Sequence, residues 1–157
     1  MKKKINFGIL IASLVIVYAV AFIGSLFTSP AINSAWYESI KPSITPPNWV
    51  FPIVWNILFF LIAISLYLSW INAKKKIDKK RIIWIFGVNF ILNIFWSVLY
   101  FGLKNPLASF FELIVLWISI LTMIFVTYRI KKPASYLLIP YIIWVSFAGV
   151  LNYLSAF

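Results

Sequence analysis

The sequence has no cysteine and no histidine among its 157 residues, and it has only three acidic residues. Without these side chains the protein cannot form disulfides, cysteine- or histidine-ligated zinc sites, thiol nucleophiles or Ser-His dyads. Charged residues make up 11% of the chain, against about 25% in an ordinary soluble domain. So few charges cannot cover a hydrophobic core with a solvated surface, which excludes a soluble fold. The missing Cys and His side chains exclude the enzyme classes that depend on them.

Apolar and aromatic residues take the place of the missing ones: 64% of the chain is hydrophobic, 20% is aromatic and the mean hydropathy is +1.00. A helix needs ~20 mostly apolar residues to cross a bilayer, and five runs qualify: residues 5–29, 47–71, 82–103, 105–128 and 133–155. These runs do not alternate as the strands of a membrane barrel would. We therefore predict an all-α membrane protein, with a bundle of five transmembrane helices in one domain over residues 1–157.

The connections between these runs are short, except for the first, which covers residues 30–46. Short connections predict that consecutive helices are antiparallel neighbours. The long connection contains three prolines and amphipathic side chains at Trp36, Tyr37 and Ile40. This composition predicts an ordered flap with a short helical turn over one end of the bundle.

The N-terminal run allows a second interpretation. Lysines at residues 2–4 precede an apolar stretch, and Ala19-Val20-Ala21 resembles the cleavage site of a signal peptide. The apolar stretch continues through Phe27, however, which makes it long enough to span as a retained helix. We adopt the retained helix.

The positive charges are distributed unevenly between the two ends of the predicted bundle. Twelve of the fourteen Lys and Arg residues lie at residues 2–4, 74–81 and 129–132, whereas the opposite end holds only Lys41 and Lys104. The positive-inside rule then predicts a cytoplasmic N-terminus, with the C-terminus and the long first connection outside a bacterial cell membrane. The lysines of residues 74–81 could also contact anionic lipid, which would imply no separate function.

The eight tryptophans fall into two groups by predicted depth. Those near the ends of the runs fit interfacial aromatic belts; they are Trp36, Trp49, Trp70 and Trp84. The deeper group consists of Trp55, Trp96, Trp117 and Trp144. Packing within the bundle is the ordinary explanation for an aromatic side chain at such depth.

Three of the predicted helices carry stripes of residues that recur at helical spacing. The stripes are Asn89, Asn93, Ser97 and Tyr100; Glu112, Ser119 and Thr122; and Pro140, Trp144, Ala148 and Asn152. An acid within a span is costly, which makes Glu112 a functional candidate. Pro140 is expected to kink its helix.

Interhelical hydrogen bonds, worth about 0.6 kcal/mol each, would explain the polar stripes without any ligand. Deep tryptophans and polar groups nevertheless converge from several helices. We therefore favour a small-molecule pocket beneath the flap, suited to a flat and largely apolar ligand. An aqueous pore would need rings of charge or of carbonyl groups, which the spans lack.

A set of motifs runs in order along the chain: Trp36-Tyr37-Glu38-Ser39-Ile40-Lys41-Pro42, Pro46-Pro47, Trp55, Asn89, Asn93, Trp96-Ser97, Pro106, Leu138-Ile139-Pro140-Tyr141, Trp144, Phe147-Ala148 and Leu151-Asn152. In residue type and spacing the chain resembles the TspO/translocator family of tryptophan-rich sensory proteins and peripheral-type benzodiazepine receptors. The resemblance covers essentially the whole length.

The resemblance implies a five-helix bundle, commonly dimeric, that binds porphyrins and isoquinoline- or benzodiazepine-like ligands beneath the first loop. It also implies, for some bacterial members, light-dependent breakdown of protoporphyrin, with Trp36 and Trp144 involved. The ligand-binding residues implied by position are Trp36, Tyr37, Pro47, Trp55, Asn89, Asn93, Trp96, Glu112, Trp144 and Ala148. The family's sterol-binding segment is the clearest departure, because no Lys or Arg follows Tyr153. Sterol transport is therefore in doubt.

A metal-free porphyrin suits this composition better than haem. With no His or Cys and only Met1 and Met123 as thioethers, the chain has few axial ligands for iron. We expect no metal site and no resident cofactor, with the porphyrin as ligand or substrate. Photochemical breakdown would then depend on the excited pigment, oxygen and an oxidisable indole.

Three functions stay open from the sequence. The leading one is a tetrapyrrole-binding membrane protein that also promotes light-dependent degradation of protoporphyrin. The alternatives are a transporter of small amphipathic molecules and a ligand-responsive regulatory or stress-sensing scaffold. The expected partners are the ligand, membrane lipid and a second copy of the chain in a homodimer, and no nucleic acid.

Overall fold

The computed structural model describes residues 5–157; residues 1–4, which include the three N-terminal lysines of the orientation argument, lie outside it. Within this part the chain forms helices α1 (Phe7–Ala31), α2 (Ala35–Ile40), α3 (Val50–Asn72), α4 (Lys76–Ser97), η1 (Val98–Gly102), α5 (Pro106–Ile130), α6 (Lys132–Tyr136) and α7 (Ile139–Ala156). Five helical segments in the described residues are long and apolar enough to cross a membrane. The predicted fold class is confirmed.

The third span begins at Lys76, six residues before its predicted start at residue 82. The apolar run marks only the part that lies in lipid, whereas Lys and Arg are good helix formers and extend the helix into water. Asp78 in the first turn favours this start, because a negative charge interacts well with a helix N-terminus. Pro30, which we placed in the flap, lies within the last turn of α1.

The fifth span is broken into α6 and α7, and residues 137–138 between them are not helical. Pro140 stands in the first turn of α7, where its missing N–H costs no helical hydrogen bond. The predicted kink is therefore a complete interruption. Ser65 of α3 forms a hydrogen bond beside this interruption: its hydroxyl donates to the carbonyl of Ala134 in α6 at 2.8 Å.

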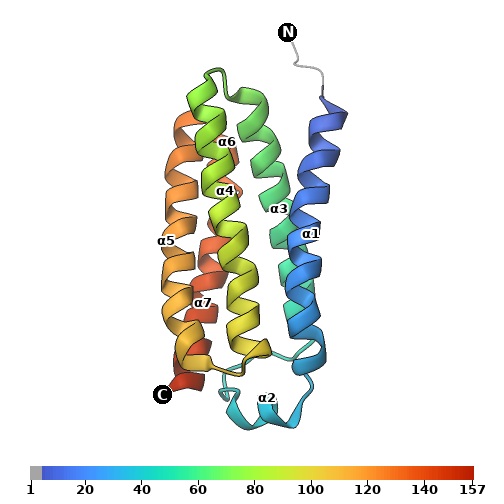
Figure 1. The fold of residues 1–157 in the computed structure, drawn as a ribbon, viewed down its shortest axis with the longest axis vertical. Helices are drawn as coiled ribbons and strands as arrows, with labels where there is room; N and C mark the ends of the chain where they lie inside the picture. The colour runs from blue at the N-terminus through green and yellow to red at the C-terminus, as the bar shows by residue number, and fades with distance from the viewer. Residues whose placement is uncertain (1–4) are drawn as a thin grey trace.

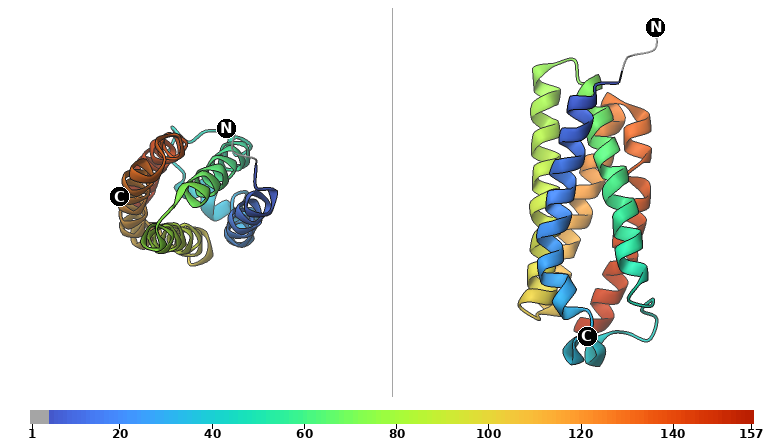
Figure 2. Two further views of the ribbon diagram at one scale, coloured as in Figure 1. Left: turned by 90° about the horizontal axis from the view of Figure 1, so that it is seen from above. Right: turned by 90° about the vertical axis from the view of Figure 1, so that its right-hand side faces the viewer.

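The helix contacts close a ring in the order α1, α3, α6 with α7, α5 and α4, and back to α1 (Figure 2). Consecutive spans are not all close neighbours, contrary to our expectation. Helices α3 and α4 touch only slightly, and α4 packs mainly against α5 and α1. The physical reason is that the polar face of α4 forms side-chain hydrogen bonds with α5 and α7. Asn89, for example, donates to the hydroxyl of Ser119 on α5 at 2.8 Å.

Helix α2 lies across one end of the bundle, the end at which α7 also terminates (Figure 1). Ser34 caps it by accepting from the N–H of Tyr37 at 3.2 Å. Tyr37 is buried against Phe101 of η1, with ring centroids 5.6 Å apart. Asn48 closes the connection by donating to the carbonyl of Ile32 at 3.1 Å. The flap with a short helix is therefore present, as the prolines and aromatics predicted.

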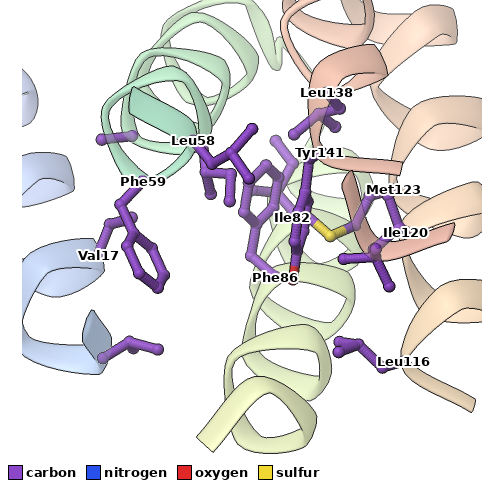
Figure 3. Close-up of a cluster of buried hydrophobic side chains, with 14 of the residues drawn as sticks. Val17, Leu58, Phe59, Ile82, Phe86, Leu116, Ile120, Met123, Leu138 and Tyr141 are labelled. Atoms are coloured by element: carbon purple, nitrogen blue, oxygen red, sulfur yellow. The ribbon is translucent and has the colours of Figure 1, made fainter. Parts of the chain in front are cut away.

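The packed hydrophobic core occupies the middle of the bundle and the half remote from α2 (Figure 3). The side chains that meet there are Ile82 and Phe86 of α4, Met123 of α5, Tyr141 of α7 and Leu138 of the break before α7, each almost fully buried. This packing leaves the half beneath α2 free to hold a cavity.

Candidate functional site

A cavity of about 540 Å³ lies in the half of the bundle beneath α2. Its walls come from the C-terminal halves of α1, α4 and α7, the N-terminal half of α3, η1 and the flap. This volume falls within the range of sites for small organic ligands, about 300–1,000 Å³.

Nine of the 23 residues that line the cavity are aromatic, and several of them form ring pairs. Trp96 and Tyr100 are stacked, with centroids 5.2 Å apart and planes 19° from parallel. Trp55 stacks on Phe59 at 5.3 Å. On the α7 side, Trp144 meets Phe51 of α3 edge to face at 5.8 Å. Such walls favour a flat, conjugated ligand.

A short π-helical segment, η1, shapes one wall of the cavity. The N–H of Leu103 donates to the carbonyl of Val98 at 2.7 Å, the i to i+5 pattern of a π-helix. The widened turn buries both Tyr100 and Phe101, and each lines the cavity. Segments of this kind occur often at functional sites. Nothing in our sequence reasoning predicted it.

The polar groups of the wall are neutral; none of the described residues that line the cavity carries a charge. Asn93 donates to the hydroxyl of Tyr141 at 3.1 Å, and Trp96 Nε1 donates to Asn152 Oδ1 at 3.0 Å. The Nε1 of Trp144 is buried and has no acceptor within the described residues. The cavity can thus stack against a ring and exchange a few neutral hydrogen bonds with it.

Tyr37 covers the cavity from α2 and remains a neutral phenol at physiological pH. Burial, helped by the neighbouring Tyr100 and Glu38, raises the pKa of Tyr37 to about 12. The described residues contain no group of three His, Cys, Asp or Glu side chains that could hold a metal ion.

The sequence model of the TspO/MBR family matches residues 12–156. The chain belongs to this family. It is 42% identical to a tryptophan-rich protein TspO of Archaeoglobus fulgidus, over 92% of each chain. A TspO of Chlorobaculum tepidum is 41% identical over 86% of this chain and 85% of its own. The translocator protein of Bos taurus is 27% identical over 84% of this chain and 79% of its own. The resemblance drawn from the motifs is confirmed.

The residues implied by the TspO resemblance divide into two groups. Six of them line the cavity: Tyr37, Trp55, Asn93, Trp96, Trp144 and Ala148. Four do not, namely Trp36, Pro47, Asn89 and Glu112. The cavity therefore brings together aromatic and amide groups from four elements, and the ligand-binding role of every one of them stays a prediction.

Three of the four residues outside the cavity wall have surroundings that the structure describes in detail. Trp36 lies at the rim, where its ring meets Tyr100 at 5.9 Å and the ammonium of Lys104 lies 5.9 Å from its centroid. Asn89 faces α5 and α7 and is fully hydrogen-bonded there, to Ser119 and Tyr141. Glu112 is buried outside the wall, and its carboxyl oxygens have no hydrogen-bond partner in the part of the chain that the structure describes.

Two other tryptophans and Thr122 can also be placed relative to the cavity. Trp49, which we assigned to an aromatic belt, lines the cavity. Trp117 is not part of the wall, and its Nε1 donates to Ser146 on α7 at 2.8 Å. Thr122, expected to share a face with Glu112, is exposed and donates to the carbonyl of Ile118 on its own helix.

Sequence reasoning missed the wall that α1 contributes. Ala21, Gly24, Ser25 and Thr28 line the cavity from this helix. The signal was available, because these small residues share one face of an otherwise bulky apolar helix. Gly24 faces α4, and a Cβ added there would be in ordinary van der Waals contact with Ser97 Oγ at 3.5 Å.

Proposed function

We propose that this TspO-family protein binds a flat, metal-free tetrapyrrole such as protoporphyrin in the cavity beneath α2. The observation that carries the proposal is a space of about 540 Å³ walled by stacked aromatic pairs and neutral amides. Stacking supplies most of the affinity in such a site, and the few hydrogen bonds orient the ring.

The charges around the cavity favour one orientation of a porphyrin. Its carboxylates would be costly among neutral side chains, so they should lie at the flap, where the bundle meets water. Lys104 stands over Trp36 at this rim, and Lys41 follows α2. Lys41 already pairs with Glu38 at 2.6 Å, which leaves Lys104 as the better partner for a carboxylate.

The finer part of the proposal is photochemical. Trp144 contacts the ligand space, and its indole is an oxidisable group of the cavity wall. We assign it the role of one-electron donor to the light-excited ring. Dioxygen then adds to the reduced ring and opens it, and the electron returns to the indole radical, so that the net reaction is addition of dioxygen to the porphyrin. Trp36 is separated from the cavity by its position at the rim and is the weaker candidate for this role.

A single set of spectra tests both parts. Purified protein is titrated with protoporphyrin in darkness, and the complex is then illuminated with and without oxygen. We expect saturable binding in darkness and loss of the Soret band only in light with oxygen, faster than for free porphyrin in the same detergent. Absence of saturable binding contradicts the proposed function. Binding with bleaching at the free-porphyrin rate contradicts only the photochemical part.

Transport of small amphipathic molecules is the second candidate, favoured by the interruption between α6 and α7. Broken helices near the midplane are typical of transporters. In this protein the break lies near one end of the fifth span, and its residue Leu138 belongs to the packed core together with Phe86. Uptake of a fluorescent porphyrin into proteoliposomes, compared with empty vesicles, distinguishes transport from binding.

A further inference from the structure

Glu112 is the one acidic residue that lies in the interior of the described bundle. Asp78, the other acid within a described span, stands in the first turn of α4. The relative exposure of Glu112 is 8%. It belongs to the buried stripe of α5, between Ser109 and Leu116. Neither carboxyl oxygen has a hydrogen-bond partner among the described residues. Each such oxygen needs a donor or a proton.

The polar side chains on either side of Glu112 are already bonded to one another. One turn toward the flap, Ser109 donates to Asn152 Oδ1 at 3.1 Å, and the same oxygen accepts from Trp96. Deeper in the bundle, Asn93 and Asn89 both bond the hydroxyl of Tyr141. Glu112 therefore lies between two closed clusters, and both include side chains of the cavity wall.

Within residues 5–157, no ion pair joins Glu112 to a cation on the helices that pack against α5. The inward-facing polar residues of α4, Asn89 and Asn93, are neutral. Tyr141 of α7 is close enough to interact electrostatically, and its hydroxyl reaches α4 (Figure 3). Tyr100 of η1 is bonded to Ser155. Lys104, in the connection before α5, is exposed.

A carboxylate with neither a countercharge nor a donor is very costly in a low-dielectric interior, and such a group takes up a proton instead. We propose that Glu112 is a proton-binding site of the bundle, neutral at ordinary pH, and that the cavity binds its ligand in this protonated state. The second half rests on the proposed function; the first does not.

The neighbouring clusters couple the proton to the cavity. An ionised Glu112 would attract the N–H donors of the two flanking clusters, which include those of Asn93, Asn152 and Trp96. In the structure these groups hold the wall in place. Asn93 donates to the hydroxyl of Tyr141 at 3.1 Å, and Asn152 donates to the carbonyl of Pro106 at 2.7 Å. Trp96 donates to Asn152 Oδ1 at 3.0 Å. Deprotonation of Glu112 should therefore disturb the cavity wall and weaken ligand binding.

Infrared spectroscopy of the ligand-free protein tests the proton site. A protonated carboxyl absorbs above the amide I band, and the only other side-chain acids are Glu38 and Asp78, both in surface ion pairs. We expect this band at neutral pH in the parent and in the double variant Glu38→Gln/Asp78→Asn, with loss in Glu112→Gln. In the double variant Glu112 is the one remaining acidic side chain, so its spectrum shows whether Glu112 is protonated even if Glu112→Gln does not fold. Absence of the band in the double variant overturns the proposal.

Binding of octaethylporphyrin, which has no carboxyl group, tests the coupling. The affinity of the parent should fall by about tenfold per pH unit once the proton is lost, because only the protonated fraction binds. Glu112→Gln should bind with constant affinity over the same range, and Glu38→Gln should follow the parent. Identical pH profiles for the parent and Glu112→Gln overturn the coupling. An infrared band without porphyrin binding at any pH leaves the proton site standing and contradicts the proposed function.

Discussion

Trp144 is the single residue at which affinity and photochemistry can be separated. We expect Trp144→Phe to lose about 1 kcal/mol of binding energy or less, because a phenyl ring still stacks. Bleaching of bound protoporphyrin should nevertheless slow strongly, since phenyl is much harder to oxidise than indole. The rate of Soret loss at matched occupancy measures this. Trp84→Phe, on an exposed side chain away from the cavity, is the control. Bleaching at the parental rate would remove the indole from the chemistry.

Ala148 leaves space beside Trp144 in the cavity wall. Ala148→Leu should fill this space, and overpacking of this kind costs about 1 to 3 kcal/mol. A dark titration should then show affinity reduced by about tenfold or more. Ala12→Leu makes the same change on an exposed face of α1 and should bind like the parent. Equal affinity of the two variants would argue against a ligand at this wall.

Tyr37 allows a test of how α2 covers the site. A pKa of about 12, above the ordinary 10.0, means that the folded state favours the neutral phenol. Its contribution to stability is therefore complete below pH ~10 and is lost as the pH rises toward 12. The tyrosinate absorbance of the parent minus that of Tyr37→Phe should titrate near 12. A difference that titrates near 10 would show that α2 does not bury the phenol.

At the scale of helices, α4 is held to α5 and α7 by side-chain hydrogen bonds, and Asn89 and Asn93 contribute differently. Asn89→Ala should lower stability by about 1 kcal/mol, from two interhelical bonds, and leave porphyrin affinity unchanged. Asn93→Ala should lower both, because Asn93 also lines the cavity. Thermal melts run beside titrations separate the two effects. Loss of affinity in Asn89→Ala would restore its predicted role as a ligand residue.

At the scale of the whole molecule, the two ends of the bundle can be assigned to the two sides of the membrane. Ser43 lies in the connection after α2 and Asp78 at the start of α4, at opposite ends (Figure 1). The chain has no cysteine, so single substitutions to Cys can be labelled without background. In intact cells, an impermeant maleimide should label Ser43→Cys and not Asp78→Cys. The reverse pattern would invert the proposed orientation.

The sequence by itself determined the five spans, the flap and the family. Spans are readable because a helix satisfies its own backbone hydrogen bonds and lipid then selects apolar side chains, both of which are local requirements. Helix ends were less readable: α4 begins at Lys76, since its first turns lie outside the apolar run that marks a span. The break before α7 was visible only as Pro140, because its extent depends on how α6 packs against α3 and α5.

Only the tertiary structure decided which polar side chains face the cavity and which face a neighbouring helix. Asn89 and Asn93 stand one turn apart on the same stripe, yet only Asn93 reaches the cavity wall. Periodicity gives a face of the helix, whereas the partners on that face depend on how far α4 is rotated and shifted against α5 and α7. Glu112 follows the same rule: its spacing predicted an inward position, and helix packing buried it outside the cavity wall, with no hydrogen-bond partner among residues 5–157.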